Sequence, residues 1–88
     1  MGMTASGLTK LTEELSELIQ VAAKKMAYFD TDDHPDGLGS LTTRLEDEAG
    51  DVLAAISFVT DKFNLDKDRI QQRVTTKLNQ YWEWDKQP

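Results

Sequence analysis

The chain has 88 residues, no cysteine and a formal net charge of −6 at pH 7. This length suits one small domain, residues 1–88, and the lack of cysteine excludes a disulfide framework and a thiolate metal site. An acidic chain without a basic patch is not expected to bind nucleic acid or an anionic membrane, and no apolar run approaches the ~20 residues of a membrane span. We therefore expect a cytoplasmic protein. A nucleotide substrate stays open, because a bound metal can invert the local field.

Residues 1–7 lack the basic and apolar regions of a secretory signal, so we expect a flexible leader there. A helix is predicted from about Leu8 to Tyr28, because apolar residues recur at helical spacing at Leu8, Leu11, Leu15, Leu18, Ile19, Ala22, Ala23, Met26 and Phe29. At ~100° per residue, Glu14 lies at the edge of this stripe and Glu17 lies farther round. The helix should therefore have one apolar face and a separate mixed face that carries both acids.

The segment Asp30–Ser40 is predicted to be a loop, since it contains Pro35 and the strong turn signal Asp36-Gly37. Its early acids are spaced as in an EF-hand. That interpretation is rejected, because the twelfth position, which must be a bidentate glutamate, is Thr43.

A second helix is predicted from about Leu41 to Lys62, with Thr43 as its N-cap and Glu46 completing a capping box. Its main apolar stripe is Leu41, Leu45, Val52, Ile56, Val59 and Phe63. Glu48 and Asp51 lie on a second line beside that stripe, as like charges at i,i+3, which weakens a helix. Gly50 in the helix interior costs roughly 1 kcal/mol relative to alanine. Several unfavourable choices in one turn indicate a functional site.

A third helix is predicted to follow Asn64, with Asp66 as its N-cap, and to extend to about Trp84. Its apolar positions are Ile70, Val74, Leu78 and Tyr81. No stretch shows strand alternation. The predicted fold class is therefore all-α, an antiparallel helical bundle whose small core is completed by oligomerisation.

Two acidic pairs, one on each of the first two helices, are the candidate site. Glu14 and Glu17 form one pair and Glu48 and Asp51 the other, each at i,i+3, so the carboxylates of a pair share a helix face. Two such helices packed face to face would make an oxygen-lined pocket. Mg²⁺ prefers such ligands and commonly bridges to substrate phosphates, with Mn²⁺ as an alternative.

Three stretches carry a likeness to a known family: Glu13-Glu14-Leu15-Ser16-Glu17-Leu18, Asp47-Glu48-Ala49-Gly50-Asp51-Val52-Leu53 and Lys77-Leu78-Asn79-Gln80-Tyr81. Over about Leu8 to Tyr81 the chain resembles the MazG-like all-α nucleoside triphosphate pyrophosphohydrolases, whose relatives include dimeric dUTPases, dCTP pyrophosphatases and phosphoribosyl-ATP pyrophosphohydrolases. It departs from them in a longer Asp30–Ser40 loop and in the ending Tyr81-Trp82-Glu83-Trp84, where many relatives have Arg-Tyr-Pro.

The resemblance implies that the four acids hold Mg²⁺ against a triphosphate. Water would attack phosphorus at the α–β linkage and release a nucleoside monophosphate and pyrophosphate. A carboxylate not fully used as a ligand could take the proton of that water, and Glu17 is our candidate. The candidate substrate-binding residues are Lys24, Lys25, Lys77 and Tyr81. The expected assembly is a homodimer or a dimer-of-dimers tetramer.

Three alternatives remain open at this stage. The first is the same chemistry on a narrower substrate, as in a dCTP or dUTP pyrophosphatase. The second is a non-catalytic helical module that binds metal or nucleotide. The third is an interaction protein whose acids recruit a basic partner.

Overall fold

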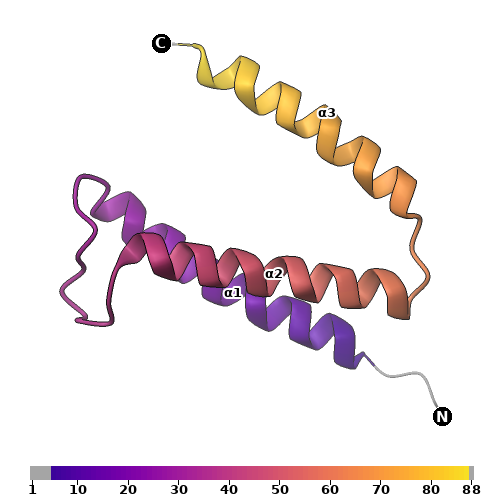
Figure 1. The fold of residues 1–88 in the computed structure, drawn as a ribbon, viewed down its shortest axis with the longest axis horizontal. Helices are drawn as coiled ribbons and strands as arrows, with labels where there is room; N and C mark the ends of the chain where they lie inside the picture. The colour runs from indigo at the N-terminus through magenta and orange to yellow at the C-terminus, as the bar shows by residue number, and fades with distance from the viewer. Residues whose placement is uncertain (1–4, 88) are drawn as a thin grey trace.

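The computed structural model describes residues 5–87, which form three helices and no strand (Figure 1). Helix α1 spans Ser6–Ala27, α2 spans Leu41–Lys62 and α3 spans Lys67–Asp85. The predicted all-α class is confirmed. No described helix combines the length and apolar composition needed to cross a membrane.

The first helix begins two residues earlier than predicted. Residues 1–4 of the expected leader lie outside the described part of the chain, whereas Ser6 and Gly7 belong to α1. Gly7 is buried against α2, where a Cβ built on it would lie 3.2 Å from the Phe58 ring. Lys62 at the end of α2 also donates a 2.6 Å hydrogen bond to the Ser6 hydroxyl. Contacts with α2 therefore hold the first turn in the helix.

The start of α2 corrects the predicted N-cap. Ser40, rather than Thr43, caps the helix, and its hydroxyl accepts a 3.1 Å hydrogen bond from the Thr43 backbone N–H. Asp32 in the loop supplies two further acceptors. Its backbone carbonyl accepts a 2.9 Å hydrogen bond from the Leu41 N–H, and its carboxylate accepts a 2.8 Å hydrogen bond from the Thr42 N–H. The helix therefore starts where the loop satisfies its free N–H groups, and the predicted capping box with Glu46 does not form.

The junction between α2 and α3 follows the sequence signals. Asn64 adopts a left-handed backbone with φ of 52° just beyond α2, and the Leu65 N–H bonds the Thr60 carbonyl at 2.9 Å, which is the pattern of a Schellman ending. Asp66 then caps α3 by accepting from the Arg69 N–H at 3.0 Å. Both predicted boundary residues are confirmed.

Helices α1 and α2 do not pack through the apolar stripe of α1. Helices α1 and α2 run antiparallel along their length (Figure 1), and their buried residues are Gly7, Val21, Leu41, Val52, Ala55, Val59 and Thr60. Most of the apolar stripe of α1 faces away from α2, with Ile19 66 % and Met26 78 % exposed. The mixed face of α1, which carries the acids, is the one that packs against α2.

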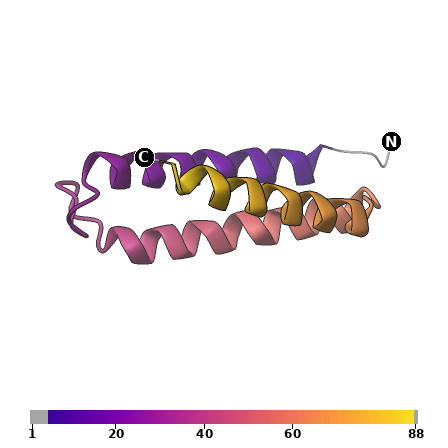
Figure 2. The same ribbon diagram turned by 90° about the horizontal axis from the view of Figure 1, so that it is seen from above.

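Helix α3 leaves the end of α2 and runs back at an angle without packing along either neighbour (Figures 1 and 2). None of its residues is buried. The radius of gyration is 16.1 Å, whereas a compact chain of this length has about 12 Å. A single chain therefore leaves large apolar surfaces open, on the outer face of α1 and along α3.

Candidate metal centre

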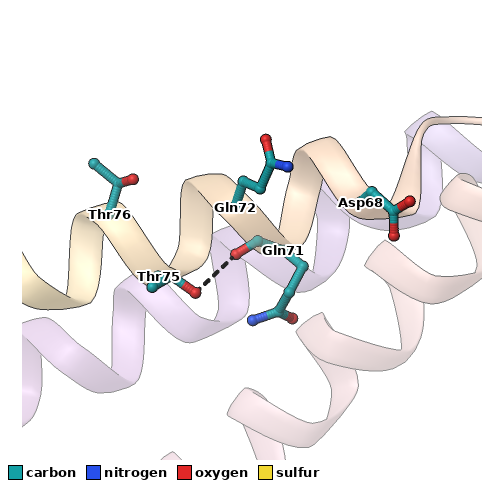
Figure 3. Close-up of a pocket in the computed structure, with 5 residues that line it drawn as sticks. All are labelled: Asp68, Gln71, Gln72, Thr75 and Thr76. Carbon is teal, nitrogen blue, oxygen red and sulfur yellow. Dashed lines mark hydrogen bonds between the residues drawn. The ribbon is translucent and has the colours of Figure 1, made fainter.

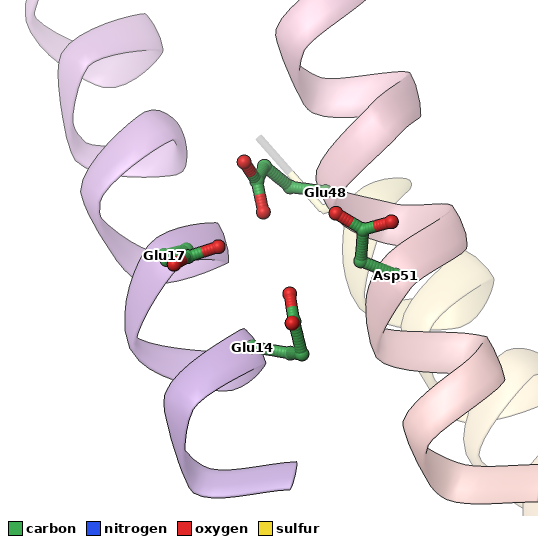
Figure 4. A group of neighbouring side chains, drawn as sticks. All are labelled: Glu14, Glu17, Glu48 and Asp51. Carbon is green, nitrogen blue, oxygen red and sulfur yellow. The ribbon is translucent and has the colours of Figure 1, made fainter. Parts of the chain in front are cut away.

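The four predicted acids meet between α1 and α2 (Figure 4). Glu14 and Glu17 project from α1, Glu48 and Asp51 project from α2, and one carboxylate oxygen from each lies within 4.8 Å of the others. Antiparallel packing brings the two i,i+3 pairs face to face, because each pair spans one turn of its own helix. The sequence placed the acids beside the apolar stripes, and the structure places them inside the helix interface.

Two of these carboxylates are under electrostatic strain. Partial burial, followed by the negative charges of Glu17 and Asp51, raises the pKa of Glu14 above its usual 4.5. The pKa of Glu48 is raised first by burial, then by the charges of Glu17, Asp51 and Glu14, and by a side-chain hydrogen bond with Glu17. One oxygen of Glu14 and one of Glu48 are buried and have no hydrogen-bond partner in the described part of the chain. Buried acceptors of this kind are costly unless something satisfies them.

The oxygen set suits a hard divalent cation. Oxygens on opposite sides of one Mg²⁺ lie about 4.2 Å apart, twice a bond length of about 2.1 Å, and those on a Ca²⁺ lie somewhat farther apart. A spread of 4.8 Å therefore needs only a small inward movement of flexible side chains to match Mg²⁺. Carboxylate-only ligation excludes a preference for soft or thiophilic ions. The four carboxylates could therefore hold a hard divalent cation.

An open groove of about 310 Å³ adjoins the acids along the same helix pair. Its lining residues are Lys10, Glu14, Asp51, Ala54, Ala55 and Phe58. The Phe58 ring is half-exposed there, which gives the groove an aromatic face beside two of the carboxylates. The groove and the acidic site are continuous, since Glu14 and Asp51 line both.

Two candidate phosphate-binding lysines lie farther along α1 and are already engaged by the loop. Lys24 Nζ is 2.8 Å from an Asp36 carboxylate oxygen, and Lys25 Nζ donates to the Thr31 carbonyl at 2.8 Å. Lys24 follows Glu17 by seven residues, or about 10 Å along the helix, on nearly the same face. Both lysines are therefore engaged by the loop, and neither lines the groove beside the acids.

The candidates on α3 are not brought to the acids within one chain. Lys77 and Tyr81 lie on an apolar surface of α3 with Ile70, Arg73, Val74 and Leu78. The polar side of α3 carries a shallow hollow (Figure 3), which is lined by Asp68, Gln71, Gln72, Thr75 and Thr76. Among the described residues, this hollow contains no group of side chains that could hold a metal ion. Only the α1–α2 interface therefore joins several metal-ligating side chains in the part of the chain that the structure describes.

Arg44 is a residue of this region that the acidic motifs of the sequence do not single out. This side chain is mostly buried and binds the Asp36 carboxylate with two nitrogens, at 3.1 and 3.2 Å. The signal that could have identified it is its position four residues before Glu48, which puts it one turn away on the same face of α2.

Comparisons with protein-family models, curated proteins and solved structures found no match to this chain. The candidate metal centre is therefore supported only by the chemistry of its own residues. Four carboxylates from two helices lie close enough together to hold a metal ion, and two of them bury an oxygen that has no hydrogen-bond partner among the described residues.

Proposed function

We propose that this chain is a Mg²⁺-dependent nucleoside triphosphate pyrophosphohydrolase, which converts a nucleoside triphosphate and water into a nucleoside monophosphate and pyrophosphate. The observation that supports the proposal is the meeting of Glu14, Glu17, Glu48 and Asp51 between two helices. An enzyme that binds a polyanion needs neutralising charge in its site, and these residues can supply it only through a bound cation. The resemblance of the same residues to the MazG-like motifs points to the same reaction.

Each acid is assigned a role from its surroundings. Glu14 and Glu48 are proposed as the principal metal ligands, because each has a buried oxygen that lacks a partner within the described structure. Asp51, the most exposed of the four, completes the set at the mouth of the groove. Glu17 is proposed to accept the proton of the attacking water. Mg²⁺ supplies Lewis acidity at the phosphates when it is bound.

We also propose that the working form is a homo-oligomer, with a second copy of this chain covering the open apolar faces. The accessible surface is 7024 Å² for a chain of 10.0 kDa, roughly 1,800 Å² more than a compact monomer of that mass exposes. Obligate homodimers bury about 1,000 Å² or more on each partner, so the excess is large enough for one. An α3 that covers a second copy would carry Lys77 and Tyr81 to the partner.

The test is product analysis by phosphorus NMR, with and without Mg²⁺, on the eight standard ribo- and deoxynucleoside triphosphates. We expect Mg²⁺-dependent formation of monophosphate and pyrophosphate, and the panel exposes any restriction to dCTP or dUTP. The variant Glu48→Gln should abolish product formation. The matched control is Glu46→Gln, which removes an exposed charge two residues away on the same helix.

The rival classes give different results in the same experiment. A non-catalytic metal- or nucleotide-binding module would bind Mg²⁺ or nucleotide saturably and release no pyrophosphate. An acidic surface that only recruits a basic partner would bind Mg²⁺ equally well in Glu48→Gln and Glu46→Gln. Full activity of a diluted monomer would overturn the oligomer while leaving the reaction in place.

A further inference from the structure

Asp36 is held more tightly than any other loop side chain. Its carboxylate accepts from Lys24 at 2.8 Å, from two Arg44 nitrogens at 3.1 and 3.2 Å, and from the Leu38 backbone N–H at 3.1 Å. His34 Nδ1 lies 3.2 Å from the same carboxylate and accepts the Asp36 N–H at 3.0 Å. These contacts hold the pKa of Asp36 well below its usual range, the hydrogen bond from Lys24 first among them. An anion is therefore strongly favoured at this position.

The two cations come from the same helix pair as the metal centre. Lys24 is on α1 and Arg44 is on α2, and Asp36 joins them across the interface. Arg44 precedes Glu48 by one turn, about 6 Å along α2, and Lys24 follows Glu17 by two turns, about 10 Å along α1. The interface therefore presents four carboxylates followed by two cations in line. A metal-bound polyphosphate chain extending along the interface would meet these cations next.

Two cations share one carboxylate at this place. Lys24 and Arg44 bring two positive charges to the single negative charge of Asp36. The Asp32 carboxylate is not a hydrogen-bond partner of either cation, since its oxygens accept from the Ser40 hydroxyl and from the backbone and hydroxyl of Thr42. A phosphate group offers more oxygens and more charge than one carboxylate, and an arginine fork binds it with two nitrogens.

We propose that Lys24 and Arg44 form a phosphate-binding seat that Asp36 fills in the free protein and yields to the phosphate chain of the substrate. Asp36 is then an internal competitor that keeps the seat assembled before substrate arrives. The inference rests on the proposed function, because the phosphate chain reaches the seat from the metal centre.

The turn that carries Asp36 is followed by two glycines with positive φ. His34-Pro35-Asp36-Gly37 forms a tight turn, closed by a 3.1 Å hydrogen bond from the Gly37 N–H to the His34 carbonyl. Gly37 and Gly39 both have positive φ, at 70° and 100°, with open space around them. Glycine rotates in this region without steric penalty, so the turn can swing while Asp32 continues to anchor the loop to α2.

The experiment uses inorganic tripolyphosphate as the probe, with the full chain and excess Mg²⁺, and measures affinity by calorimetry. Asp36→Asn removes the competitor's charge and should tighten binding by about tenfold, the worth of one charge-assisted hydrogen bond. Arg44→Gln should weaken binding by about tenfold or more for the same reason. The matched control is Asp33→Asn, which removes the same charge from an exposed loop side chain and should change affinity less than Asp36→Asn does.

A second measurement uses the wild-type chain, so it does not depend on the folding of any variant. Tripolyphosphate should shift the Leu38 amide resonance in nitrogen–proton NMR, because that N–H loses its bond to Asp36. The proposal is overturned if Asp36→Asn binds no tighter than Asp33→Asn, or if the Leu38 resonance is unmoved at saturation. If tripolyphosphate binds and shifts the Leu38 resonance but no nucleotide is hydrolysed, the phosphate-binding seat is supported and the proposed hydrolase activity is contradicted. If nucleotide is hydrolysed and Asp36→Asn leaves KM unchanged, the hydrolase activity is supported and the phosphate-binding seat is contradicted.

Discussion

Glu14 of α1 and Glu48 of α2 each bury a carboxylate oxygen that has no hydrogen-bond partner within residues 5–87, and both residues contribute to one set of oxygens within 4.8 Å of one another. The two residues are 34 positions apart in the sequence. Without a cation, their proximity opposes the packing of the two helices. Function and stability should therefore respond to these residues in opposite directions.

Glu48→Gln should lower Mg²⁺ affinity by on the order of 100-fold, at least as much as the loss of an outer-shell partner of a metal ligand. The same variant should raise the melting temperature of the metal-free chain, because it removes a strained charge beside Glu17 and Asp51. Calorimetric Mg²⁺ titration and thermal unfolding in EDTA measure the two effects. Glu46→Gln should change neither. A lower melting temperature of metal-free Glu48→Gln than of the metal-free wild type would contradict the proposed charge repulsion at Glu48.

The metal-free chain should be most stable in mild acid. Glu14 and Glu48 have raised pKa values, so above pH 4.5 the folded state holds protons that the unfolded state has lost, and the free energy of unfolding falls as pH rises through this window. Asp32 acts in the opposite sense. Hydrogen bonds from Ser40 and Thr42 lower its pKa from 3.8 to about 2, so its contribution is present above 3.8 and is lost as pH falls toward 2.

The measurement is urea unfolding in EDTA from pH 3 to pH 7.5, with an expected maximum at about pH 4–5. Saturating Mg²⁺ should flatten the decline toward neutral pH, because the cation stabilises the ionised carboxylates. A stability that rises steadily from pH 5 to pH 7 without metal would contradict the raised pKa values.

Leu41→Ala should be the most damaging single truncation in the α1–α2 core. Leu41 is fully buried, at 0 % exposure, where the loop joins α2. Removing a buried leucine side chain costs about 2–5 kcal/mol, including the cavity it leaves. Urea unfolding at fixed protein concentration measures the loss. The exposed loop residue Leu38 provides the control, since Leu38→Ala should change stability by less than about 0.5 kcal/mol.

Leu78→Asp should disrupt the proposed oligomer. Leu78 lies on the apolar surface of α3 with Val74 and Tyr81 and is half-exposed in the single chain. A charge there should weaken self-association by at least about tenfold, which sedimentation over a concentration series can measure. Gln72→Asp, on the polar side of α3 (Figure 3), introduces the same charge and should leave association unchanged. Equal effects of both variants would exclude this surface.

Gly50→Ala should stabilise the chain by roughly 1 kcal/mol, the helix-propensity difference between the two residues. Gly50 is exposed within α2, and a Cβ built on it meets nothing within 4 Å. The glycine beside the acids is therefore not required by packing in one chain. Thermal unfolding of the variant tests this, and a loss of stability that depends on protein concentration would show that a second copy approaches there.

The sequence by itself determined the helices and the identity of the candidate ligands. Apolar spacing is local, as are the turn around Pro35, the left-handed Asn64 and the Asp66 cap, so each element could be predicted from neighbouring residues. The two i,i+3 acidic pairs were visible for the same reason.

Only the tertiary structure decided which faces meet. The larger apolar stripe of α1, with Ile19 and Met26, suggested a packing surface, yet α2 covers the face with Val21 and the acids. Nor could spacing show that Asp36 would join Lys24 to Arg44, because those contacts span 8 to 12 residues through a loop. Periodicity defines the faces of a helix, but which face a neighbour covers depends on the relative rotation of the two helices, which long-range contacts set.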